Sequence, residues 1–138
     1  MSDNKSIEQL ENDFWGNAPT ESSNLVLKIH SLRRKKLSEL EPEDIRVLIS
    51  QNVSLEILIP LALKVLETNP FIECDYYEGD LLKSVLTSKG NYWTKHPDKR
   101  REIFELFERN KEALINLDTT DDIRDSLIDS FKEFSESM

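Results

Sequence analysis

The sequence is poor in cysteine and contains no long apolar run. Cys74 is the only cysteine among 138 residues, so an intramolecular disulfide is excluded and no Cys/His set exists to hold zinc. No segment approaches the roughly 18 apolar residues that cross a bilayer. The first residues, MSDNKSIEQLEND, lack the basic start and the apolar stretch of a secretory signal. These absences predict a cytoplasmic protein that does not bind membranes.

Glycine and histidine are scarce as well, which argues against enzyme chemistry. The only glycines are Gly16, Gly79 and Gly90, so the glycine loops that cradle phosphates are missing. His30 and His96 have no nucleophile motif beside them. We therefore expect a protein that is not an enzyme and that uses no cofactor.

Apolar residues recur at spacings of three and four almost everywhere, and alternating β-branched residues are rare, which predicts an all-α protein. Pro42 fits the first turn of a helix, with Glu43 and Asp44 beside the positive end of its dipole. Asp80 is expected to cap the helix that follows it. The expected helices cover 6–14, 23–32, 42–52, 54–70, 81–87, 97–116 and 118–134, with a loop over 88–97.

The length of the chain suits a single domain with an ordinary core. Segment 54–70 is apolar nearly all round and predicts a central helix, in which Pro60 produces a kink or marks a start. We expect one domain over 1–138, folded as an irregular orthogonal bundle of about six helices. The polar ends, 1–20 and 135–138, are expected to fray.

The charge of the chain indicates the kind of partner. With 27 acidic and 18 basic side chains, the formal net charge is -9. This charge repels nucleic acid and anionic membranes and attracts a basic protein. A nuclease, whose active site is built to hold phosphates, is an obvious basic target.

The segment ECDYYEGD concentrates acidic and aromatic residues. Glu78 and Asp80 lie where the positive end of a helix dipole favours acidic residues, but this explanation does not extend to Glu73 and Asp75. An acidic surface with tyrosine anchors suits the binding of a basic protein. The expected contact residues are Glu73, Asp75, Tyr76, Tyr77, Glu78 and Asp80, with Asp121, Asp122 and Asp125 of the acidic last helix as a second contact.

Two alternatives to a protein-binding surface are a metal site and a nucleic-acid-binding site. The segment DYYEGD lacks the spacing of a calcium loop, so no metal site is expected. The basic stretches 33–36 and 95–101, the latter beside Tyr92 and Trp93, suit a nucleic-acid-binding or regulatory helical domain. The simpler interpretation is that Trp93 packs into the core and that the basic residues form a solvated face.

Several motifs resemble one family. The succession LSELEPEDIRVLISQNVSLEILIPLALKVLETNPF, YYEGDLLKSVL and YWTKHP is similar to the bacterial contact-dependent growth inhibition (CDI) immunity proteins, over roughly residues 25–107. The most specific parts are 40–48 with Gln51, PLAL at 60–63, and GDLL at 79–82 followed by Trp93.

This resemblance implies a cytoplasmic protein that binds the C-terminal toxin domain of a large CDI effector and neutralises it. Such toxins are often nucleases, and we expect a 1:1 complex in which the active-site cleft is blocked. The family pattern does not fix the contact residues, which remain an inference from charge. A helical module without a toxin partner is a further alternative.

Overall fold

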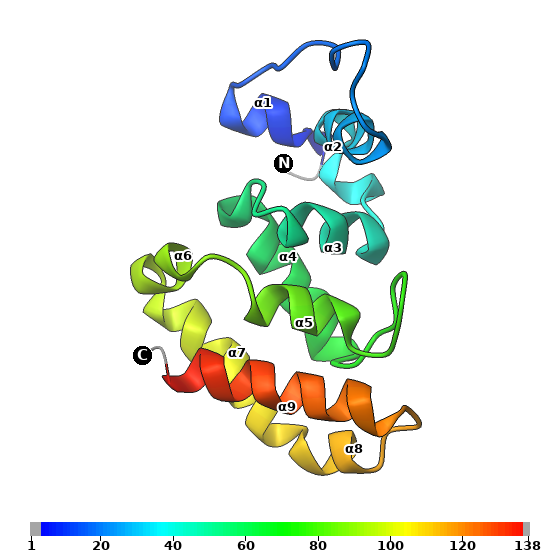
Figure 1. Ribbon diagram of the computed structural model, residues 1–138. Helices are drawn as coiled ribbons and strands as arrows, with labels where there is room; N and C mark the ends of the chain where they lie inside the picture. Colours follow the sequence, from blue (N-terminus) through cyan, green and yellow to red (C-terminus); the bar gives the residue numbers. More distant parts are fainter. Residues whose placement is uncertain (1–3, 137–138) are drawn as a thin grey trace.

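The computed structural model describes residues 4–136, and within this range every regular element longer than a single β-bridge is helical (Figure 1). The all-α prediction is confirmed, although the nine α-helices of the described part exceed the expected six or so. The elements are α1 (Ile7–Glu11), α2 (Asn24–Arg34), the 3-10 helix η2 (Leu37–Glu39), α3 (Pro42–Ser50), α4 (Leu55–Thr68), α5 (Asp80–Leu86), α6 (Gly90–Lys95), α7 (Pro97–Arg109), α8 (Lys111–Ile115) and α9 (Asp121–Glu136).

Two helix starts follow the signals in the sequence. The Ser23 hydroxyl accepts a hydrogen bond from the Val26 amide at 3.3 Å and caps α2. Pro42 is the first residue of α3, and the Asp44 carboxylate accepts from the Glu41 amide at 3.0 Å. Both helices begin where the sequence predicts them.

Two predictions in the C-terminal half are wrong in detail. The segment 88–97, expected to be a loop, contains α6, because burial of Tyr92 and Trp93 fixes a helical turn there. The expected single helix over 97–116 is divided at Asn110, whose side-chain amide donates to the Leu106 carbonyl at 2.8 Å. The additional helices in the described residues come largely from these two regions.

The core lies where α3, α4 and α5 meet. Helix α4 continues through Pro60 and packs against α3, α5 and α7, as expected of a central helix. Helix α5 is buried along almost its whole length and packs against α3, α4 and α9. Between them, these contacts connect the two ends of the bundle.

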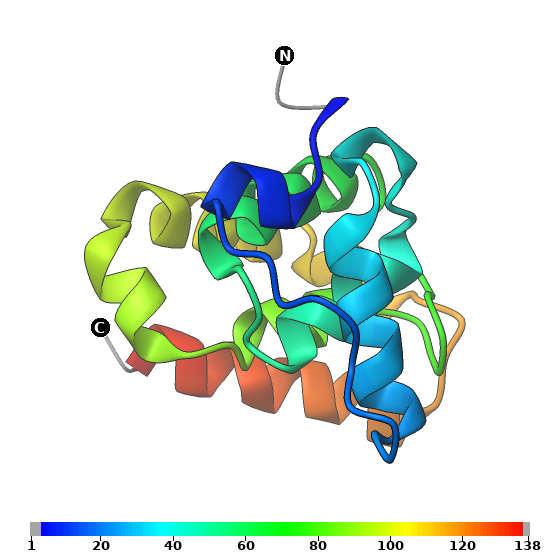
Figure 2. The ribbon, with the colours of Figure 1, turned by 90° about the horizontal axis from the view of Figure 1, so that it is seen from above.

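Figure 1 shows the helices in three tiers, with α1 and α2 at one end, α3 to α5 in the middle and α7 to α9 at the other. Figure 2 shows the segment between α1 and α2 running along the outside of α2. Of the ends expected to fray, 1–20 and 135–138, residues 1–3 and 137–138 lie outside the described residues. Between 4 and 136, no helix is both long and apolar enough to cross a membrane.

Candidate functional site

The acidic segment forms a tight turn between α4 and α5. Glu73 and Glu78 form an isolated antiparallel bridge across it. Gly79 closes the turn with φ at 87°, a conformation that favours glycine. A Cβ at this position would lie 2.7 Å from Cδ1 of Leu127 in α9, so the turn also depends on close packing against α9.

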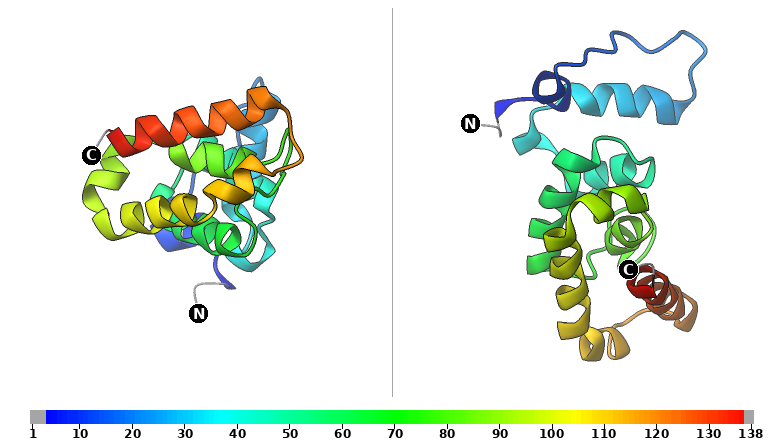
Figure 3. Two further views of the ribbon diagram at one scale, coloured as in Figure 1. Left: turned by 90° about the horizontal axis from the view of Figure 1, so that it is seen from below. Right: turned by 90° about the vertical axis from the view of Figure 1, so that its left-hand side faces the viewer.

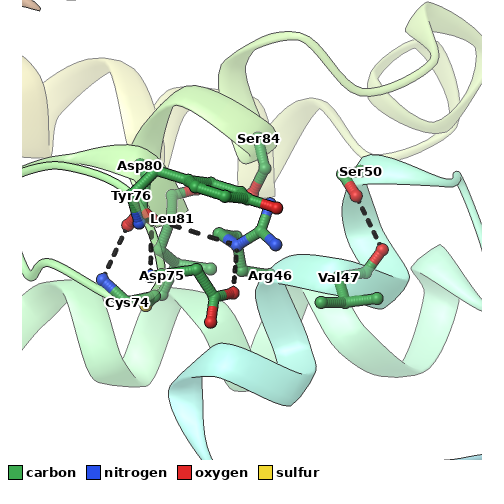
Figure 4. Close-up of polar contacts among 9 residues, drawn as sticks. All are labelled: Arg46, Val47, Ser50, Cys74, Asp75, Tyr76, Asp80, Leu81 and Ser84. Atoms are coloured by element: carbon green, nitrogen blue, oxygen red, sulfur yellow. Dashed lines mark hydrogen bonds and ion pairs between the residues drawn. The ribbon is translucent and has the colours of Figure 1, made fainter. Parts of the chain in front are cut away.

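The Asp80 carboxylate fixes the backbone of the turn. Its Oδ1 accepts a hydrogen bond from the Cys74 amide at 2.8 Å, and its Oδ2 accepts from the Asp75 and Tyr76 amides at 2.9 and 3.0 Å (Figure 4). A carboxylate satisfying three amides is a strong, charge-assisted arrangement. The loop backbone is therefore fixed by one side chain.

This geometry corrects the role expected of Asp80. Gly79, not Asp80, is the N-cap of α5, and Asp80 is the first helical residue. The Asp80 carboxylate turns back to the loop because three amides there point toward it. Only 4% of Asp80 is exposed, so it supports the surface instead of forming part of it.

Arg46 of α3 lies beside the turn. Its Nε lies 2.7 Å from Oδ2 of Asp75 and 3.9 Å from Oδ2 of Asp80. The Arg46 guanidinium also lies over the Tyr76 ring, 4.8 Å from the centroid. Part of the negative charge of the turn is therefore compensated within the chain, as Figure 4 shows.

The two tyrosines differ in exposure. Tyr76 is 73% exposed, the largest value among the exposed large hydrophobic residues of the described part. Tyr77 is half-buried, and burial raises the pKa of its hydroxyl. Burial also raises the pKa of the Cys74 thiol to about 12, which keeps it protonated and unreactive at neutral pH. Tyr76 is thus the aromatic group most open to a partner.

Glu73 and Glu78 influence each other electrostatically. The hydrogen bond with Glu78 and its negative charge raise the pKa of Glu73. The nearby Thr119 hydroxyl, followed by the Glu73 carboxyl group, lowers the pKa of Glu78. Thr119 belongs to the loop that precedes α9, so Glu78 places the turn near that loop.

The second predicted group lies at the start of α9. Asp121, Asp122 and Asp125 are all exposed. Asp121 pairs with Arg124 at 2.9 Å, whereas Asp122 and Asp125 form no ion pair with any residue of 4–136. These two aspartates therefore contribute uncompensated negative charge.

The two acidic groups lie on the same edge of the molecule. The close packing of Gly79 against Leu127, together with the proximity of Glu78 to Thr119, places the turn beside the first half of α9. Figure 1 shows the turn and the first residues of α9 together at the right-hand side. We define the acidic edge as the exposed or half-buried members of the predicted set, namely Glu73, Asp75, Tyr76, Tyr77, Glu78, Asp121, Asp122 and Asp125.

The basic segment 33–36 does not form a continuous cationic strip. Arg33 is only 1% exposed, and its Nη2 donates to Oε1 of Glu11 at 2.9 Å. Its guanidinium stacks 3.9 Å from the centre of the Trp15 ring. Lys35 pairs with Asp44 at 3.1 Å. Two of the four basic side chains of this segment are therefore paired with carboxylates of the same chain.

Two residues of the basic segment 95–101 also have partners within the chain. His96 lies 2.6 Å from a Glu56 carboxylate oxygen, and Arg100 donates to the Phe134 carbonyl at 3.1 Å. Trp93 is buried and donates through Nε1 to the Ser88 hydroxyl at 3.1 Å. Trp93 packs into the core, as the simpler interpretation predicted, and its ring is not exposed for stacking on a base.

Sequence reasoning missed Arg46, the cation that organises the turn. It lies on α3, 29 positions before Asp75, and no local motif links the two residues. In the described part of the chain, no group of three or more His, Cys, Asp or Glu side chains is placed to hold a metal ion.

Comparison with known proteins identifies the family. A family model described as CDI immunity proteins matches residues 9–103. No curated protein and no solved structure matches the chain. The matched segment covers more than half of the 138 residues and includes the turn, Asp80 and Arg46. The chain therefore belongs to the family of CDI immunity proteins.

Proposed function

We propose that the protein binds the C-terminal toxin domain of a CDI effector in a 1:1 complex and neutralises it. In this proposal the toxin is a nuclease, and the acidic edge covers its active-site cleft. Family membership supports the class of partner. The choice of surface rests on one observation: the acidic turn and the acidic start of α9, which are distant in the sequence, lie side by side, and Tyr76 of the turn is exposed.

Electrostatic complementarity supports this choice of surface. Lysines and arginines that hold phosphates around a nuclease cleft would face Glu73, Asp122 and Asp125. Complementary charge raises the association rate and selects against wrong partners. Tyr76 supplies an aromatic anchor of the kind that concentrates binding energy at interfaces.

The size of the interface explains why both acidic groups are needed. A Kd of 1 nM corresponds to about 12 kcal/mol, and stable complexes bury about 800 Å² on each partner. That is about a tenth of the accessible surface of 8105 Å². The turn alone is too small, so the start of α9 has to contribute.

A charge-reversal experiment tests both the partner and the surface. We expect the triple variant Glu73→Lys, Asp122→Lys, Asp125→Lys to bind the catalytically inactivated toxin domain encoded beside its gene at least about 100-fold more weakly than the wild type. Isothermal titration calorimetry measures the affinity. Circular dichroism should show unchanged helix content, because all three side chains are exposed.

A matched control separates local contact from overall charge. The variant Asp98→Lys, Glu105→Lys, Glu133→Lys makes the same net change at exposed positions on α7 and near the end of α9, away from the acidic edge (Figure 1). We expect it to bind within a few-fold of the wild type. Equal losses in both variants would mean that overall charge, and not the acidic edge, determines the affinity. Unchanged affinity in the acidic-edge variant would place the interface elsewhere. A wild type that does not bind at micromolar concentration would refute the toxin pairing. Retention on heparin at moderate salt would favour the nucleic-acid-binding alternative.

A further inference from the structure

A second surface with different chemistry lies between α7, α8 and α9. These helices line an apolar groove of about 420 Å³ that is open to the surface. Figure 3 (left) shows α7 and α8 along one side and α9 along the other. The rings of Phe104, Phe107 and Phe131 line the groove, and Ile115 and Ile128 stand at its rim with 67% and 42% of their surfaces exposed.

Toxin binding by the acidic edge does not account for this groove. Every residue that lines it lies between 104 and 135, beyond the segment 9–103 matched by the family. Unlike the acidic edge, the groove has more basic than acidic residues, since two lysines and only one carboxylate line it. The groove is therefore a feature of this chain's C-terminal helices.

The two lysines are not equivalent. Lys111 pairs with Glu108 at 3.0 Å and lies 5.8 Å from the centre of the Phe131 ring. Lys132 forms no ion pair within residues 4–136. In a protein of net charge -9, an uncompensated lysine beside exposed apolar surface is suited to the negative end of an amphipathic ligand.

We propose that this groove binds a free medium-chain fatty acid. The alkyl chain would lie against the phenylalanine rings, and the carboxylate would pair with Lys132. The volume falls within the roughly 300–1,000 Å³ of small-ligand sites, which combine apolar walls with a few polar groups. The uncompensated charge of Lys132 would disfavour a basic toxin at this groove, and a second copy seated symmetrically would bring two Lys132 side chains together.

Titration with sodium dodecanoate below its critical micelle concentration tests the proposal. We expect micromolar binding to the wild type. Decanoate should bind about tenfold more weakly, because two fewer methylene groups are buried. The variant Ile115→Gln, Ile128→Gln should also weaken binding at least about tenfold. Both side chains are exposed, so folding should be retained.

Reversing the charge at the rim tests the role of Lys132. In Lys132→Glu, the affinity for dodecanoate should fall at least about tenfold, and dodecyltrimethylammonium should become the better ligand. The matched control Lys64→Glu, at an exposed position on α4, should bind dodecanoate like the wild type. Three results would overturn the proposal: no binding to the wild type, equal dodecanoate affinity in both charge variants, or binding only to phosphatidylglycerol vesicles.

Discussion

At the scale of single residues, Asp80 fixes the turn of the acidic edge, because its buried carboxylate accepts three backbone hydrogen bonds. Asp80→Asn removes the charge and turns an amide group toward donors. We expect the free energy of unfolding to fall by about 2–3 kcal/mol, since buried amides lose a charged partner. Urea denaturation monitored by circular dichroism measures this change.

The control for that substitution is Asp125→Asn. Asp125 is exposed and forms no ion pair in the described range, so we expect a change within about 0.5 kcal/mol. A similar loss in both variants would mean that net charge, and not the Asp80 hydrogen bonds, determines stability.

The sequence alone shows which residues of the turn are acidic, but it does not predict which of their side chains are exposed. Asp80 and Glu78 are neighbours of the same glycine, yet one is buried and the other is half-exposed. The difference arises because the loop folds back over Asp80, which depends on Arg46 and on α9. Both partners are distant in sequence, so no local pattern shows them.

At the scale of elements, the contact between α5 and α9 depends on Gly79. Gly79→Ala introduces a Cβ at 2.7 Å from Leu127 and places alanine at φ 87°. We expect a loss of about 2–4 kcal/mol from backbone strain and overpacking together. Thermal unfolding followed by circular dichroism is the measurement.

Gly90→Ala is the matched control. Gly90 is the first residue of α6, and a Cβ there would have no atom within 4 Å. Because alanine favours helix by up to about 1 kcal/mol over glycine, stability should be unchanged or slightly raised. A comparable loss at both glycines would contradict the specific role of the Leu127 contact.

Helix starts and apolar stripes were predictable because they depend on neighbouring residues. Ser23 and Pro42 act within one turn, and the buried Leu127, Phe131 and Phe134 of α9 follow the helical period. The helix over Gly90–Lys95 was not predictable, since glycine and proline at its ends resemble a loop. Its formation depends on tertiary burial of aromatic side chains, which a local pattern does not contain.

For the whole molecule, the net charge of -9 and the convergence of acidic groups should govern association with a basic toxin. We expect the association rate to fall more than about tenfold between low and high salt, because a Debye length of about 10 Å at 0.1 M shrinks to about 3 Å at 1 M. The dissociation rate should change much less. Stopped-flow fluorescence provides both rates, and an association rate independent of salt would argue against electrostatic steering.

The three amide bonds to Asp80 also bear on the thermodynamics of complex formation. A turn already locked in the unbound protein loses little conformational entropy when it docks. The binding free energy is then reduced only slightly by the entropy cost of ordering the chain. The immunity protein would present a preorganised surface to its target, and this preorganisation would come from the buried carboxylate of Asp80.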